Sequence, residues 1–150
     1  MRDSQRVTME NVQIIFRNFS GKEGMYNREG DRNFCVILSN DVAAQMLRDG
    51  WNVKELEPRD EGDEPTPYLP VTVNFRNIPP KVVMITSNGR TILGEDQVEL
   101  LDWADILNVD LIVTPYEWHV NGRAGVKAYL KTMYITIEED ELELKYSNVG

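Results

Sequence analysis

The stretch VDLIVTPYEWHVNGRAGVKAYLKTMYITI, residues 109–137, predicts one long β-hairpin. Its centre is Asn121-Gly122, a residue pair that a tight type I′ turn favours because both of its central residues need a positive φ. If these two residues form the loop, Val120 lies opposite Arg123 and the rest of the pairing follows. A shift by one residue would mix apolar and polar side chains on both faces, which favours this register.

Two different faces result, because successive side chains along a strand point to opposite sides of a sheet. One face is aliphatic and predicts a core formed by Leu111, Val113, Val126, Ala128 and Leu130. On the other face the predicted pairs are Trp118 with Gly125, Tyr116 with Lys127, Thr114 with Tyr129 and Ile112 with Lys131. Aromatic rings interleaved with amines are typical of a surface on which bases stack while phosphates are neutralised.

The composition predicts one globular domain over residues 1–150. A chain of this length is sufficient for one hydrophobic core and short for two. Its apolar content of 41% and charged content of 27% are ordinary for a soluble protein, and no apolar run is long enough for a transmembrane helix. The N-terminus, MRDSQRVTMENV, lacks the apolar core of a signal peptide, so we expect a cytoplasmic protein with no membrane partner.

The formal net charge of −9 is concentrated in two segments. Residues 55–64 hold six acids and one base, and residues 138–143 hold five acids and no base. The rest of the chain carries 14 acids and 15 bases, a balance that allows a locally basic groove. We expect a flexible acidic loop at 57–70 and an acidic, polar C-terminal segment at 138–150. These segments are either solvated, bound to a partner, or placed in the basic groove.

The remaining pattern adds strands and helices. The apolar pattern predicts four further strands, at 7–19, 33–39, 51–56 and 69–75. The strand at 69–75 alternates cleanly, and that at 33–39 is apolar enough to be buried. A second Asn-Gly pair, at 88–89, predicts a short hairpin of 81–86 with 91–93. Two helices are expected, a short one at 41–50 with Asn40-Asp41 as N-cap, and one of about three turns within 94–107.

Many short strands around two helices indicate a mainly β protein built as a small closed or partly closed β-barrel. An OB-like barrel with insertions fits this order best, with 109–137 as its last hairpin. A β-sandwich and another α+β sheet remain alternatives.

The sequence contains no catalytic or metal-binding constellation. His119 is the only histidine and Cys35 the only cysteine, so an internal disulfide, a zinc site and a Cys-His nucleophile are all excluded. No phosphate-cradling glycine motif occurs, and the acids at 60–64 lack the spacing of a calcium loop. We therefore expect a protein without catalysis, metal or cofactor. Cys35 is expected to be a buried or half-buried hydrophobe, His119 partly exposed and Trp103 in the core, while Trp51 fits either the core or the surface.

The aromatic and basic residues predict a protein that binds single-stranded nucleic acid. Tyr116, Trp118 and Tyr129 are expected to stack on bases, and Arg123, Lys127 and Lys131 to contact phosphates. Secondary candidates for phosphate contact are Arg17, Lys22, Arg28, Arg32 and Arg76. The same face also fits packing under a helix or the acidic loop, a subunit interface in a homo-oligomer, or cation–π pairing of its lysines with its rings.

Three segments resemble small single-stranded-DNA-binding proteins of tailed phages and mobile elements. They are NREGDRNFCVIL at 27–38, GWNVKEL at 50–56 after a helix, and the 109–137 hairpin. The resemblance would span most of residues 10–146. It implies an OB fold that coats exposed single strands during DNA replication or recombination, with the proteins of those processes as further partners. Such proteins often carry an acidic C-terminal tail, whereas EEDELELKYSNVG, residues 138–150, ends in polar and aromatic residues.

The net charge motivates a second hypothesis of a different class. An acidic interaction protein, either a DNA mimic or a phage structural subunit, would present a regular row of acids on its surface. Nucleic-acid binding predicts instead that the acids lie away from the 112–131 face. The choice between DNA and RNA is left open, because it depends on contacts to the 2′-hydroxyl.

Overall fold

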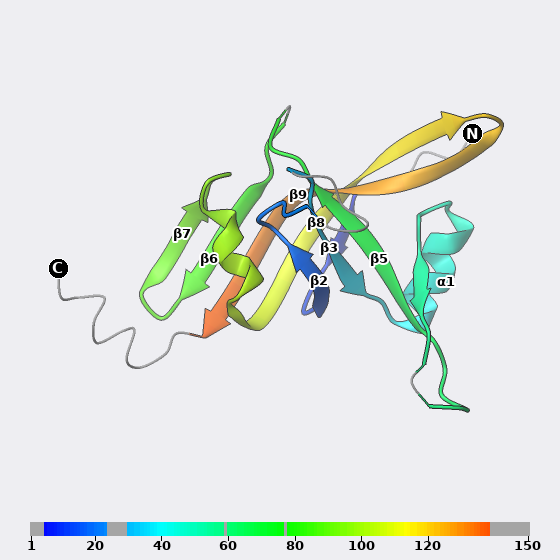
Figure 1. Ribbon diagram of the computed structural model, residues 1–150, viewed down its shortest axis with the longest axis horizontal. Helices are drawn as coiled ribbons and strands as arrows, with labels where there is room; N and C mark the ends of the chain where they lie inside the picture. The colour runs from blue at the N-terminus through cyan, green and yellow to red at the C-terminus, as the bar shows by residue number, and fades with distance from the viewer. Residues whose placement is uncertain (1–4, 24–29, 59, 77, 139–150) are drawn as a thin grey trace.

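The computed structural model describes residues 5–23, 30–58, 60–76 and 78–138 (Figure 1). These residues form a mainly β fold, which confirms the predicted class. The strands are β1 (Val7–Met9), β2 (Ile14–Asn18), β3 (Arg32–Ile37), β4 (Lys54–Leu56), β5 (Thr66–Val73), β6 (Lys81–Thr86), β7 (Gly89–Leu93), β8 (Asp105–Val120) and β9 (Arg123–Glu138). With them are one α-helix, α1 (Asn40–Arg48), and one short 3₁₀ helix, η1 (Val98–Asp102).

The β8–β9 hairpin has the predicted turn and, near that turn, the predicted register. Asn121 and Gly122 both have positive φ, 49° and 78°, and Val120 pairs with Arg123. The predicted pairs Trp118–Gly125, Tyr116–Lys127 and Thr114–Tyr129 are all confirmed. The end of this hairpin projects from the body of the sheet on the side of α1 (Figure 1).

The predicted pair Ile112–Lys131 is wrong, because β9 contains a bulge. Val113 pairs with Leu130 and Ile112 with Thr132, so Lys131 is the extra residue. The bulge absorbs a change in the phase of the apolar pattern along β9. Buried side chains fall at even positions up to Leu130 and then at Met133 and Ile135. With the bulge, Met133 faces the core opposite the buried Leu111.

The strands are ordered β1-β8-β9-β5-β3-β2 in one sheet whose path does not close. The two ends of the path, β1 and β2, are consecutive in the chain and are joined by residues 10–13. The result is an OB-like barrel that is only partly closed, as predicted.

One edge of β9 is shared by β5 and β6. β5 runs parallel to β9 and pairs Val71 with Ala128 and Thr72 with Tyr129. β6 also runs parallel and pairs from Lys81–Thr132 to Ile85–Thr136. No pair of either strand falls on Leu130 or Lys131 among the described residues, so a gap in the pairing separates the two strands.

The core confirms the aliphatic face of the hairpin, since its five predicted residues are all buried. Phe34 of β3 stacks on Phe19 with 5.2 Å between ring centroids, and both rings are fully buried. Trp51 is also buried, and it forms a bridge to Val126 of β9. Among the described residues, no polar or charged residue is buried.

The predicted strand 7–19 is divided into β1 and β2. Asn11 and Phe16 adopt positive φ values of 54° and 52°, which interrupts the regular alternation of a strand. Regular alternation would place Phe16 on the same face as the buried Ile14, but Phe16 is exposed and meets Tyr68 edge-on at 5.9 Å between centroids.

The predicted helix within 94–107 is wrong beyond η1, and residues from Asp105 onward belong to β8. Arg17 of β2 donates Nη1–H bonds to the carbonyls of Leu101 and Ala104, each 2.8 Å. The Asp102 carboxylate accepts from the backbone N–H groups of Phe19 and Ser20. These bonds fix the segment against β2 in place of a longer helix. As a consequence Trp103, predicted to be in the core, is exposed.

Other boundaries differ by a few residues. Helix α1 is confirmed, although its N-cap is Ser39, whose Oγ accepts from the N–H of Val42. The loop predicted at 57–70 ends earlier, because β5 begins at Thr66. The β6–β7 turn is Ser87-Asn88, and Gly89 already pairs with Thr86.

None of the helices in the described ranges is long and apolar enough to cross a membrane.

At pH 8, Cys35 of the folded protein is expected to react slowly with Ellman's reagent. Cys35 is half-buried as predicted, and this burial raises the pKa of its thiol from 9.0 to about 11, although the charge of Lys54 acts in the opposite direction. The thiolate is the reactive form, so unfolding in urea should accelerate labelling by about tenfold or more. Equal labelling rates with and without urea would contradict this burial.

Candidate nucleic-acid interface

Tyr116 and Tyr129 form a pair of rings on the outer face of the hairpin. Their centroids are 5.5 Å apart, and the ring planes are inclined by 35°. The Lys127 amine lies 5.5 Å from the centroid of the Tyr129 ring, so the predicted cation–π pairing is present. Tyr116 is 56% exposed and Lys127 and Lys131 are exposed, so neither α1 nor the described part of the acidic loop covers this face.

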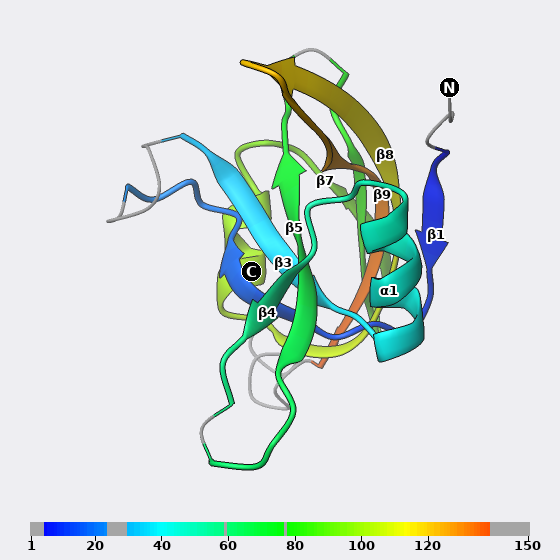
Figure 2. The same cartoon turned by 90° about the vertical axis from the view of Figure 1, so that its right-hand side faces the viewer.

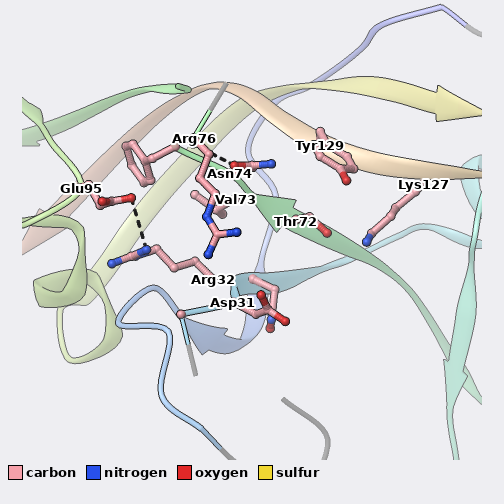
Figure 3. Close-up of a pocket in the computed structure, with 12 residues that line it drawn as sticks. Asp31, Arg32, Thr72, Val73, Asn74, Arg76, Glu95, Lys127 and Tyr129 are labelled. Carbon is pink, nitrogen blue, oxygen red and sulfur yellow. Dashed lines mark hydrogen bonds and ion pairs between the residues drawn. The ribbon is translucent and has the colours of Figure 1, made fainter. Parts of the chain in front are cut away.

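A groove of about 260 Å³, which we call the Arg32 groove, lies beside this pair of rings. It brings together four predicted residues from three places in the chain: Arg32 on β3, Arg76 after β5, and Lys127 and Tyr129 on β9. Figure 3 shows Arg32 and Arg76 in the middle of this groove and Lys127 and Tyr129 at one end of it. Arg32 is positioned by Glu95, with 3.5 Å between Nη1 and Oε2, and by the Phe75 ring at 5.9 Å.

A second groove of about 500 Å³, the Lys131 groove, lies on the other side of the rings. It is lined by Tyr116, Tyr129 and Lys131 and by two cations that the sequence did not indicate, Arg6 and Lys81. Arg6 immediately precedes β1, which pairs with β8, and Lys81 begins β6, which pairs with β9. Pairings between residues so distant in the chain have no signal in a local pattern.

The two grooves meet at Tyr129 and Asn74, which line both of them. The Lys131 groove opens where the pairing of β5 with β9 stops and that of β6 begins. The bulged residue Lys131 lies in this gap. The Lys131 groove therefore lies where β9 changes its pairing partner from β5 to β6, and Lys131 is one of the cations that line it.

Trp118 and Arg123 lie closer to the hairpin turn than the grooves do. The Trp118 ring covers Gly125 so closely that a Cβ there would be 2.8 Å from its Cζ2 atom. Trp118 lines a separate shallow hollow with Gly50 and His119, and His119 is exposed. Arg123 is exposed beside the turn and lines neither groove.

Two secondary candidates, Arg17 and Lys22, do not line the grooves. Arg17 has a structural role, since its guanidinium holds the carbonyls of Leu101 and Ala104. Lys22 lies over the ring of Trp103, 5.7 Å from the centroid. Arg28 lies outside the described residues, as does all but the first residue of the 138–150 segment.

Acidic residues line one of the two grooves and not the other. Among the described residues, the Lys131 groove is lined by three cations and no acid, and the Arg32 groove includes two acids, Asp31 and Glu95. The exposed acids at 60–64 lie on the connection from β4 to β5. Figure 2 shows this connection at the opposite end of β5 from the projecting hairpin.

Comparison with known proteins gives one family and one fold. A family model described as "Putative phage ssDNA-binding domain" matches residues 1–150. The single-stranded DNA-binding protein from bacteriophage Enc34, in complex with ssDNA, is similar with a TM-score of 0.58 and 10% identity, over 91% of this chain and 88% of that one. A C-terminal truncation of the Enc34 protein gives a TM-score of 0.57 at 10% identity, over 91% and 87% of the two chains. No curated protein sequence matches.

Proposed function

This chain belongs to the phage ssDNA-binding domain family, and from that premise we propose that it binds single-stranded DNA without catalysis. The binding surface would consist of the Arg32 groove, the Tyr116–Tyr129 pair and the Lys131 groove. The other candidates on the outer face, Trp118 and Arg123, would contact the DNA only where it passes towards the hairpin turn.

The observation that carries the proposal is the continuity of this surface. Tyr129 lines both grooves, so a DNA strand can pass from one groove to the other across the exposed Tyr116 ring and the half-buried Tyr129 ring. Cations stand on both sides of the rings: Arg32, Arg76 and Lys127 on one side, and Arg6, Lys81 and Lys131 on the other. This arrangement matches the requirement of a single strand, whose phosphates repeat along the path while each base offers a flat face.

The exposed Tyr116 ring favours single-stranded DNA over a duplex. A base stacks on a side chain only if its face is free, and in a duplex the faces are covered by neighbouring bases. Stacking on an aromatic side chain requires no particular base, so we expect binding with little sequence preference.

The biological role that we propose is protection of exposed single strands during phage DNA replication or recombination, in the cytoplasm of the host cell. The support is the family, together with the likeness of the fold to the Enc34 protein, which is known in complex with ssDNA.

Binding to a fluorescein-labelled oligothymidine, followed by fluorescence anisotropy, is expected to weaken steeply with salt. If three to four phosphates are contacted, a single strand gives a slope of log K against log salt of about −2 to −3. An increase from about 50 to 200 mM NaCl would then lower the binding constant about 16- to 64-fold. A duplex of the same length is the control and should bind more weakly. The absence of binding at the lower salt concentration would overturn the proposed function.

A further inference from the structure

Trp103 is the most exposed of the three tryptophans of the chain. It is 65% exposed, compared with 36% for Trp118 and 5% for Trp51. Tryptophan is highly buried on average in folded proteins, and it is enriched at contact surfaces because its ring is apolar and its N–H is polar. Trp103 lines neither groove, so the surface described above does not account for its exposure.

The backbone on both sides of Trp103 is firmly held. Arg17 donates to the carbonyls of Leu101 and Ala104, which bracket the tryptophan, at 2.8 Å each. The preceding residue, Asp102, accepts from two backbone N–H groups near the end of β2, at 2.7 and 3.1 Å. The ring is thus presented by a fixed segment, as a binding residue should be if little entropy is to be lost on contact.

A cation, Lys22, lies over the Trp103 ring, and the residue before Lys22 contacts the Arg32 groove. The Lys22 amine lies 5.7 Å from the centroid of the indole ring. Gly21, the residue before Lys22, lies against Arg32, because a Cβ on Gly21 would be 3.4 Å from Arg32 Cγ. Gly21 also accepts a 2.8 Å bond from the N–H of Gly30, which lines the groove. In Figure 3 the η1 ribbon lies on the Glu95 side of the pocket, away from Lys127.

We propose that Trp103, together with Lys22, is a second base-stacking site that extends the path of single-stranded DNA beyond the Arg32 groove. This inference rests on the proposed function. The two aromatic sites share one chemistry, a ring with an amine over it. The Tyr129 site lines the Arg32 groove, and the Trp103 site is next to Gly21, which lies against Arg32. A strand long enough to leave the groove past Gly30 would place a base on the indole and a phosphate near Lys22.

The test compares oligothymidines of increasing length, from about 4 to about 16 nucleotides, which is the range of site sizes for OB folds. Trp103→Ala is expected to bind the shortest oligonucleotides as the wild type does, and to lose about tenfold in affinity for the longest. Trp103→Phe, which keeps a ring, should recover most of that loss. Ile92→Ala is the matched control, since it removes an equally exposed apolar side chain that lines neither groove.

A second measurement compares the tryptophan fluorescence of Trp118→Phe, which keeps Trp51 and Trp103, with that of Trp118→Phe/Trp103→Phe, so that the difference between the two reports Trp103. Quenching by long but not by short oligonucleotides is the expected result. If Trp103→Ala melts at the wild-type temperature and binds every length normally, the inference is overturned while the proposed function stands. A change in sedimentation with unaltered DNA affinity would identify Trp103 as a protein contact and also overturn it. If the wild type binds no oligonucleotide at all, both the inference and the proposed function are wrong.

Discussion

Replacing both Tyr116 and Tyr129 with alanine is expected to weaken binding to an oligothymidine about a hundredfold at low salt. Each base stacked on an aromatic side chain contributes about 1–3 kcal/mol, so the loss of two rings removes about 2.7 kcal/mol even near the lower end of that range. The effect is large because Tyr129 belongs to both grooves and Tyr116 is its neighbour at 5.5 Å. Fluorescence anisotropy at fixed salt measures it.

The matched control is the double variant Tyr116→Phe/Tyr129→Phe, which keeps both rings and loses only the hydroxyls. It should bind nearly as well as the wild type. Thermal unfolding of both variants shows whether the hairpin remains folded, since Tyr129 is half-buried. An alanine variant that is folded and binds with unchanged affinity would show that the hairpin face is not the DNA-binding surface.

Phe34→Ala is expected to lower the free energy of unfolding by about 3–5 kcal/mol, the usual cost of emptying a fully buried phenylalanine site. Phe34 has no exposed surface, and it stacks on Phe19 with 5.2 Å between centroids and 24° between planes. Its strand, β3, lies between β5 and β2 in the sheet, so the cavity would open where three strands meet. Urea denaturation followed by circular dichroism measures the change.

Val42→Ala serves as the control for Phe34→Ala. Val42 is exposed on α1, and surface substitutions of this kind usually change the free energy of unfolding by less than about 0.5 kcal/mol. If the two variants unfold at similar urea concentrations, the stacked pair is not part of the core as described.

The hairpin could be predicted because its determinants are local. Asn121-Gly122 specifies the turn, and strict alternation from Val113 to Leu130 specifies the register. The bulge at Lys131 escaped prediction, although the apolar pattern of β9 does change phase before Met133. A phase change alone does not tell which residue is left unpaired.

The rest of the site depends on contacts between residues far apart in the chain. The helical spacing of its apolar neighbours predicts that Trp103 lies on a helix and packs in the protein core, and two of those neighbours, Val98 and Leu101, are indeed buried. The bonds that turn the indole outward come from Arg17 and from the end of β2, more than 80 residues away. Arg6 and Lys81 reach the Lys131 groove for a similar reason, through the pairings of β1 and β6.

The change of pairing partner along β9, from β5 to β6, divides the sheet into two parts. On one side of Leu130–Lys131, β9 is joined to β5, β3 and β2; on the other side it is joined to β6 and β7. The β8–β9 hairpin is therefore common to the two parts of the sheet. A DNA strand bound as proposed would contact Arg32 on one part and Lys81 on the other, so it would bridge the two parts of the sheet and hold them together.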